Sequence, residues 1–248
     1  MRYSLPLAWV ALALVALAAP VFAASPVPVS VGRSRDGVLQ DLQHKVDLLV
    51  GPGRVNVQTD YLGAKAGDAD PWFWINPGRP IQLTLVDRKS PSYVVGWYNE
   101  SGAEPVLDGV DDALVLDRVR LRGVRVGFQV PRTVVRFGFF LTQNNPGIGH
   151  STVKHCTNRT FNAPGCRGQA PAQQPLDGDP QMLVYDISRW AGPQTWLVAC
   201  EIDDAGLRMG HGDGECDHDY SDVIFTVSGV AITPTLNSTF GKVKQRYH

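Results

Sequence analysis

The sequence predicts an all-β protein, a β-sandwich of the jelly-roll type with one short helix near its N-terminus. Three observations lead to this fold class. The chain has 248 residues, of which 44% are hydrophobic, and this is enough for one hydrophobic core. Short apolar runs follow one another with turn residues between them, a pattern typical of sandwiches and jelly rolls. The best segment of helical periodicity precedes the strands.

The helix is expected at residues 36–50. Apolar residues recur there at helical spacing, Ser34 or Asp36 can cap the start, and Gly51 and Pro52 end it. The apolar runs that follow predict strands at residues 55–61, 81–86, 93–98, 115–121, 123–130, 134–141, 182–185, 195–200 and 223–227. Residues 144–178 are the longest irregular stretch, which is usually functional or flexible in a compact domain.

The N-terminal segment, residues 1–24, is typical of a secretory signal peptide. Arg2 precedes an apolar run at residues 5–19, and Val21 and Ala23 suit the −3 and −1 positions of a cleavage site. A membrane anchor is the alternative, but the run is shorter than the about 20 residues of a bilayer span. We therefore expect residues 25–248 to be one secreted or periplasmic domain with no membrane span after cleavage.

The four cysteines agree with export, because an even number in an exported chain indicates disulfides. Of the three possible pairings we favour Cys156–Cys166 with Cys200–Cys216, since each closes a local loop rich in Gly, Asn and Asp. A zinc site built from all four is the alternative, but the chain has no C-x-x-C pair.

Charge is distributed unevenly along the chain. The formal net charge is only −1, which gives no reason to expect a nucleic-acid partner. Residues 201–222, however, contain eight Asp or Glu residues against one Arg208, so this acidic segment carries −7 and the rest of the chain +6. We expect the chemistry of the protein to lie in the acidic segment.

The composition of the acidic segment suits calcium. Ca²⁺ takes six to eight oxygen ligands from flexible loops, and glycines let backbone carbonyls turn inward. A solvated hairpin loop without an ion is the alternative, and the EF-hand pattern is absent. The candidate calcium ligands are Glu201, Asp203, Asp204, Asp213, Asp217, Asp219 and Asp222.

Other functions have weaker support. Arg118, Arg120 and Arg122 alternate along a predicted strand and so share one face, which is either solvated or a surface for anionic polysaccharide. The chain lacks G-x-S-x-G and Gly-rich phosphate-loop motifs, so we do not expect an enzyme. The alternatives are therefore a carbohydrate-binding module and, second, a hydrolase that uses carboxylates of the acidic segment.

One motif resembles a known family. Glu201 ends a predicted strand, and the sequence Asp217-His-Asp-Tyr-Ser-Asp222 leads into the next one. This arrangement is similar to the Glu…Asp-x-Asp-Tyr-Asn-Asp motif of an exported bacterial domain of unknown function, found in PEP-CTERM-sorted proteins and in repeat-in-toxin adhesins. The similarity extends over residues 37–230, and Ser221 stands where the family has Asn.

The resemblance implies a jelly-roll β-sandwich outside the cytoplasm, with suspected calcium binding and no established enzymatic activity. We therefore expect a secreted, non-catalytic protein with calcium as its cofactor and a role in adhesion or extracellular matrix. Its partner would be an extracellular polysaccharide or a cell-surface component. Replacement of Asn by Ser221 would remove one carbonyl ligand.

Overall fold

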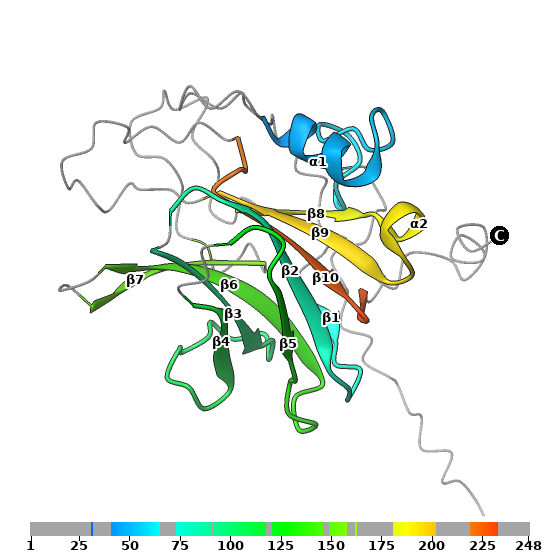
Figure 1. The fold of residues 1–248 in the computed structure, drawn as a ribbon. Coiled ribbons are helices and arrows are strands. Elements are labelled where there is room, and N and C mark those ends of the chain that lie inside the picture. The colour runs from blue at the N-terminus through cyan, green and yellow to red at the C-terminus, as the bar shows by residue number, and fades with distance from the viewer. Residues whose placement is uncertain are drawn as a thin grey trace, which may run out of the picture.

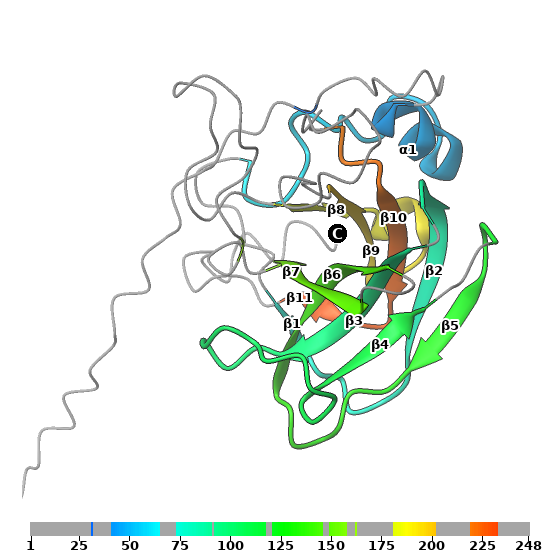
Figure 2. The same ribbon diagram turned by 90° about the vertical axis from the view of Figure 1, so that its left-hand side faces the viewer.

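The protein is a two-layered β-sandwich in the computed structural model, which describes residues 31, 41–64, 73–90, 92–117, 121–145, 149–157, 162, 181–201 and 219–232. Figures 1 and 2 show the two antiparallel sheets facing each other. The predicted sandwich is thus confirmed, and its jelly-roll connectivity stays a prediction.

The first layer is a six-stranded sheet in the order β11-β1-β6-β3-β4, with β7 paired to β6. Its strands are β1 (Trp74–Ile75), β3 (Tyr93–Asn99), β4 (Asp112–Leu116), β6 (Arg136–Asn145), β7 (Gly149–Cys156) and β11 (Ala231–Ile232). The second layer is a five-stranded sheet in the order β5-β2-β10-β9-β8. Its strands are β2 (Ile81–Arg88), β5 (Arg125–Phe128), β8 (Met182–Asp186), β9 (Thr195–Cys200) and β10 (Val223–Ser228).

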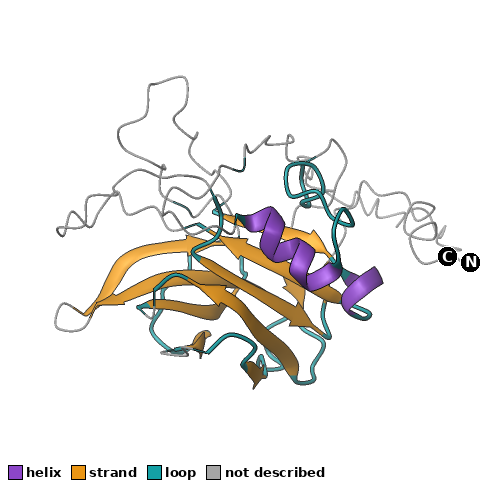
Figure 3. Ribbon diagram, turned by 45° about the horizontal axis from the view of Figure 1, so that its top comes forward, coloured by secondary structure: helices purple, strands orange, loops and turns teal. Residues whose placement is uncertain are grey.

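The five-stranded sheet is covered on both faces. Its inner face packs on the other sheet in a core that includes Leu83, Phe139 and Phe225. Its outer face packs under helix α1 (Leu42–Val50), as Figure 3 shows, in a second core that includes Leu42 and Leu197. Two-sided burial explains why every residue of β9 is buried and why its sequence is continuously apolar.

Helix α1 begins later than the sequence predicts. Asp41 is its N-cap, and the Asp41 carboxylate accepts a hydrogen bond of 2.9 Å from the backbone N–H of His44. Ser34 and Asp36 therefore do not cap it. The helix ends as predicted, at Gly51, where a φ of 97° favours glycine. A second helix, α2 (Ser188–Ala191), is a single turn.

The predicted strand at residues 55–61 is wrong. The segment is a series of turns in which side chains bind the backbone: Asn56 accepts from the N–H of Gln58, and Asp60 accepts from the N–H of Asn56. The alternation that suggested a strand comes from Val55, Val57 and Tyr61, which are buried in the core beneath α1.

Three other expectations also change. The stretch 144–178 is not wholly irregular, because it contains β7, which pairs with β6. The strand predicted at residues 115–121 is shifted toward the N-terminus, as β4 (Asp112–Leu116). Arg122 lies in a turn rather than on a strand face. The very short strands β1 and β11 were not predicted.

The proposed signal peptide, residues 1–24, lies outside the described residues. Among the helices that the structure describes, none has the length and apolar character needed to cross a bilayer.

Gly96 of β3 offers a test of the packing. A Cβ there would collide with the ring of Phe140 and lie 2.6 Å from the carbonyl oxygen of Ala113, whereas a Cβ at Gly127 of β5 would meet nothing within 4 Å. We expect Gly96→Ala to lower the free energy of unfolding by about 1–3 kcal/mol through overpacking. Gly127→Ala is the matched control and should leave it unchanged or slightly raised. Urea unfolding measures both, and equal midpoints would contradict the packing.

Candidate functional site

Strand register brings the two ends of the acidic segment together. Val223, the first residue of β10, is paired with Cys200 at the end of β9 and with Arg88 at the end of β2. Glu201, Asp222 and Lys89, which extend these strands, therefore lie at one end of the five-stranded sheet. Backbone hydrogen bonds continue the pairing there, from Lys89 N to Asp222 O and from Asp222 N to Cys200 O.

Asp219 is the most deeply buried carboxylate at this end, with no exposed surface. Its Oδ1 accepts a hydrogen bond from the backbone N–H of Ser221 at 2.7 Å, and its Oδ2 accepts one from the Ser221 hydroxyl at 2.8 Å. Ser221 therefore orients Asp219, a role that its position in the motif did not reveal.

Lys89 supplies a cation to this group of described carboxylates. Its Nζ lies 3.0 Å from Oδ2 of Asp219 and 3.3 Å from Oδ1 of Asp222, so one ammonium group joins two carboxylates. Burial by itself would raise the pKa of Asp219, but the nearby charge and hydrogen bond of Lys89, together with the two hydrogen bonds from Ser221, outweigh it and lower that pKa. Asp219 is therefore ionised at neutral pH.

Glu201 binds a backbone group of the turn before β10. Its Oε2 accepts a hydrogen bond of 2.7 Å from the backbone N–H of Tyr220. Tyr220 has a φ of 51°, in the left-handed region that is unfavourable for a bulky residue, and its buried ring packs in the core beneath α1. The hydrogen bond and the buried ring together hold this strained turn, which directs Asp219 toward Lys89.

Cys200 lies beside this group, at the end of β9 and in the core between the sheets. Burial raises the pKa of its thiol, and the negative charges of Asp222 and Glu201 raise it further. No disulfide joins any two described residues; Cys156 is also buried, and Cys166 and Cys216 lie outside the described part. The two pairings therefore stay predictions.

The described residues contain only part of the predicted calcium ligands. Glu201, Asp219 and Asp222 lie at the same end of the five-stranded sheet, whereas Asp203, Asp204, Asp213 and Asp217 lie outside the described residues. Within the residues that are described, no group of three His, Cys, Asp or Glu side chains is placed to hold a metal ion. The arrangement seen there binds the ammonium group of Lys89 through two carboxylates.

The sequence did not indicate Lys89. It follows an alternating strand and lies 130 residues before Asp219 in the chain, so no local pattern links the two. Lys89 could have been identified only with the knowledge that β2 lies beside β10 in the sheet.

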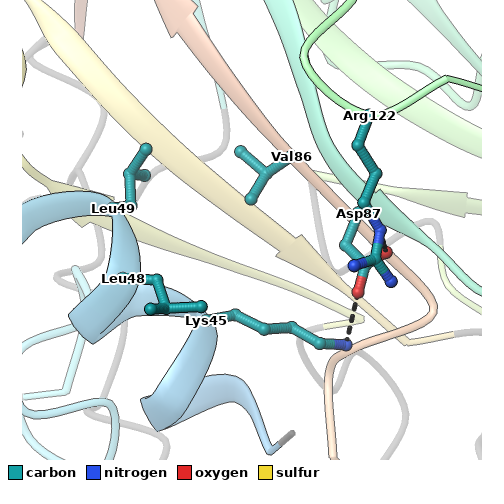
Figure 4. Close-up of a pocket in the computed structure, with 6 residues that line it drawn as sticks. All are labelled: Lys45, Leu48, Leu49, Val86, Asp87 and Arg122. Atoms are coloured by element: carbon teal, nitrogen blue, oxygen red, sulfur yellow. Dashed lines mark ion pairs between the residues drawn. The ribbon is translucent and has the colours of Figure 1, made fainter.

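A second ionic group lies between α1 and the same sheet, beside a pocket of about 190 Å³ (Figure 4). Lys45 of α1 lies 2.9 Å from Oδ2 of Asp87 on β2, and Nε of Arg122 lies 2.7 Å from Oδ1. Of the three arginines proposed as a polysaccharide surface, Arg122 is thus paired with Asp87, and Arg118 and Arg120 lie outside the described residues.

Comparisons with protein-family models, curated proteins and solved structures found no match to this chain.

The lowered pKa of Asp219 predicts a pH dependence of stability. Because this pKa is lower in the folded protein than its ordinary value of 3.8, ionised Asp219 stabilises the fold above pH 3.8, and this stabilisation is lost as the pH falls through the native pKa. We expect Asp219→Asn to reduce the free energy of unfolding at pH 7 by about 1.5–3 kcal/mol, the range for a hydrogen bond to a charged group. The difference in the free energy of unfolding between Asp219→Asn and the parent protein should become smaller below pH 3.8.

Urea unfolding in chelator across the acid range measures this difference. The exposed Asp111, in the loop before β4, supplies the control Asp111→Asn, which should follow the parent at every pH. A constant difference between Asp219→Asn and the parent down to the lowest pH would contradict the ion pair as the source of stability.

Proposed function

We propose that this protein is a secreted or periplasmic, non-catalytic β-sandwich whose acidic segment binds calcium and which serves adhesion or extracellular matrix assembly. One observation carries the proposal: Asp219 and Asp222, at the base of the acidic segment, already share a cationic group, the ammonium of Lys89. The same two carboxylates are suited to a calcium ion, which prefers anionic oxygen ligands.

The charge of the acidic segment supports the proposal. Its formal charge of −7 in 22 residues is self-repulsive unless cations or water screen it. Calcium would neutralise part of this charge and join the segment to the end of the sheet. The proposed ligands are the acidic side chains named in the sequence analysis, of which Glu201, Asp219 and Asp222 would form the base of the site.

The rigidity of the base also supports the proposal. Cys200 and Val223 belong to strands that are buried on both faces, so the carboxylates next to them are positioned before any ion arrives. Preorganisation lowers the entropy lost on binding. The disulfide pairings Cys156–Cys166 and Cys200–Cys216 belong to the same proposal. The second would close most of the acidic segment into a loop and so restrict its conformations.

The setting and the partner rest on the sequence. The N-terminal segment suits export, and the motif from Asp217 to Asp222 resembles a domain of exported adhesins and sorted proteins. We infer a cell-surface component or an extracellular polysaccharide as the partner.

Thermal unfolding with calcium and with chelator tests the proposal. Calcium at about a hundred times its Kd would contribute about 2.7 kcal/mol, which raises the midpoint of a domain of this size by several degrees. Magnesium should give a smaller shift, because it demands a tighter octahedral geometry. The absence of a shift at millimolar calcium would overturn the proposal.

Variants of the ligands locate the effect. Asp217→Asn and Asp222→Asn should reduce the calcium-dependent rise of the midpoint, because each removes a charged ligand oxygen. Asp111→Asn changes an exposed carboxylate outside the acidic segment and is the matched control, which should keep the full rise. An equal reduction in all three variants would show that calcium acts through general charge screening.

A further inference from the structure

The pocket of about 190 Å³ between α1 and β2 has two unlike sides. Figure 4 shows Leu48 and Leu49 of α1 on one side and the charged groups of Lys45, Asp87 and Arg122 on the other. Leu48 is 69% exposed although it is apolar, so its side chain is accessible to a ligand. An apolar surface with a few polar groups beside it is typical of small-molecule sites.

A β-bulge in β2 brings the charged side to the pocket. On β10, Ile224 is opposite Asp87, and its neighbour Phe225 is opposite Leu85. Val86 is therefore an extra residue in β2, and it changes the alternation of that strand. Asp87 lies on the same face as Ile224, beneath α1, and does not follow Leu85 into the core between the sheets. Both Val86 and Asp87 thereby line the pocket.

Positive charge exceeds negative charge in this group. Nζ of Lys45 lies 2.9 Å from Oδ2 of Asp87, and Nε of Arg122 lies 2.7 Å from Oδ1, so two cations share one carboxylate and the formal charge is +1. Because Lys45 already neutralises Asp87, the charge of Arg122 remains for a ligand.

The guanidinium of Arg122 is also accessible. Its side chain is 66% exposed, and the contact with Asp87 uses only Nε. Among the described residues, no acceptor binds its two terminal nitrogens. A guanidinium group that is fixed on one edge and free on the other suits a carboxylate, which it can bind through two parallel hydrogen bonds.

We propose that this pocket binds a small carboxylate that carries a short alkyl chain. Arg122 binds the carboxylate at the mouth of the pocket, and the chain lies against Leu48, Leu49 and Val86. This site does not depend on the calcium binding proposed above. The volume of about 190 Å³ corresponds to about six water-sized groups of about 30 Å³ each, so a chain of about four carbons fits.

The apolar side of the pocket distinguishes this ligand from an acidic sugar. The hydroxyl groups of a sugar ring would lose hydrogen bonds to water against Leu48, Leu49 and Val86, which offer no polar side-chain atom in return. An alkyl chain has no such groups and gains from the burial of its surface.

Titration of the isotope-labelled full chain with acetate, propanoate, butanoate and pentanoate, followed by NMR at constant ionic strength, tests the proposal. Each added methylene should raise the affinity about fourfold, the factor that corresponds to the burial of one CH₂ group. The backbone amide signals of Leu48, Leu49 and Val86 should shift. Pentanol has the chain without the charge and should bind about tenfold more weakly than pentanoate.

Variants separate the two sides of the pocket. Arg122→Gln should weaken pentanoate binding about tenfold, as expected for the loss of a hydrogen bond to a charged group, and Arg122→Lys should lose less. The matched control is Arg132→Gln, which changes an exposed arginine in the turn before β6. Leu48→Ser should reduce the gain with chain length, whereas Val106→Ser, at an exposed valine in the loop before β4, should keep it.

Three results would overturn the proposal. Equal affinities for acetate and pentanoate would exclude the apolar contact, and unchanged pentanoate binding in Arg122→Gln would exclude the ionic one. Glucuronate is a carboxylate on a polar ring; if it bound more tightly than pentanoate, the ligand would be an acidic sugar and not an alkyl carboxylate.

Discussion

The strands β8, β9 and β10 of the five-stranded sheet are largely buried on both faces, and the rest of the structure depends on this constraint. One face packs on the second sheet and the other on α1, so a shift of register by one residue would exchange one core for the other. The pairing of β2, β10, β9 and β8 is therefore strongly specified. Because their ends are aligned, residues far apart in the chain meet at the same end of the sheet.

Charges that lie against this buried sheet must be paired, since an isolated charge out of water is costly. Two groups of the described residues meet this requirement with opposite charge balance. Beneath α1, the two cations Lys45 and Arg122 share one carboxylate. At the end of β2, two carboxylates share the ammonium group of Lys89. The second arrangement lies where the acidic segment joins the sheet.

Strands with a full face of apolar residues could be predicted from the sequence. The predicted segments 195–200 and 223–227 correspond closely to β9 and β10, because continuous burial requires a continuous apolar run. The segment 55–61 shows why the same reasoning fails elsewhere. Its alternating residues are buried by a helix that packs over them, while the side chains of Asn56 and Asp60 accept hydrogen bonds from the backbone of a series of turns.

The candidate site divides in the same way. By itself, the sequence determined the β-rich fold class, the end of the helix at Gly51, and the position of the acidic segment between two strands, because all three depend on residues that are neighbours in the chain. Only the tertiary structure decided which cation faces Asp219 and Asp222. That choice depends on β2 lying beside β10. Strand order is set by packing between segments that are distant in the chain, and the sequence around Lys89 does not indicate it.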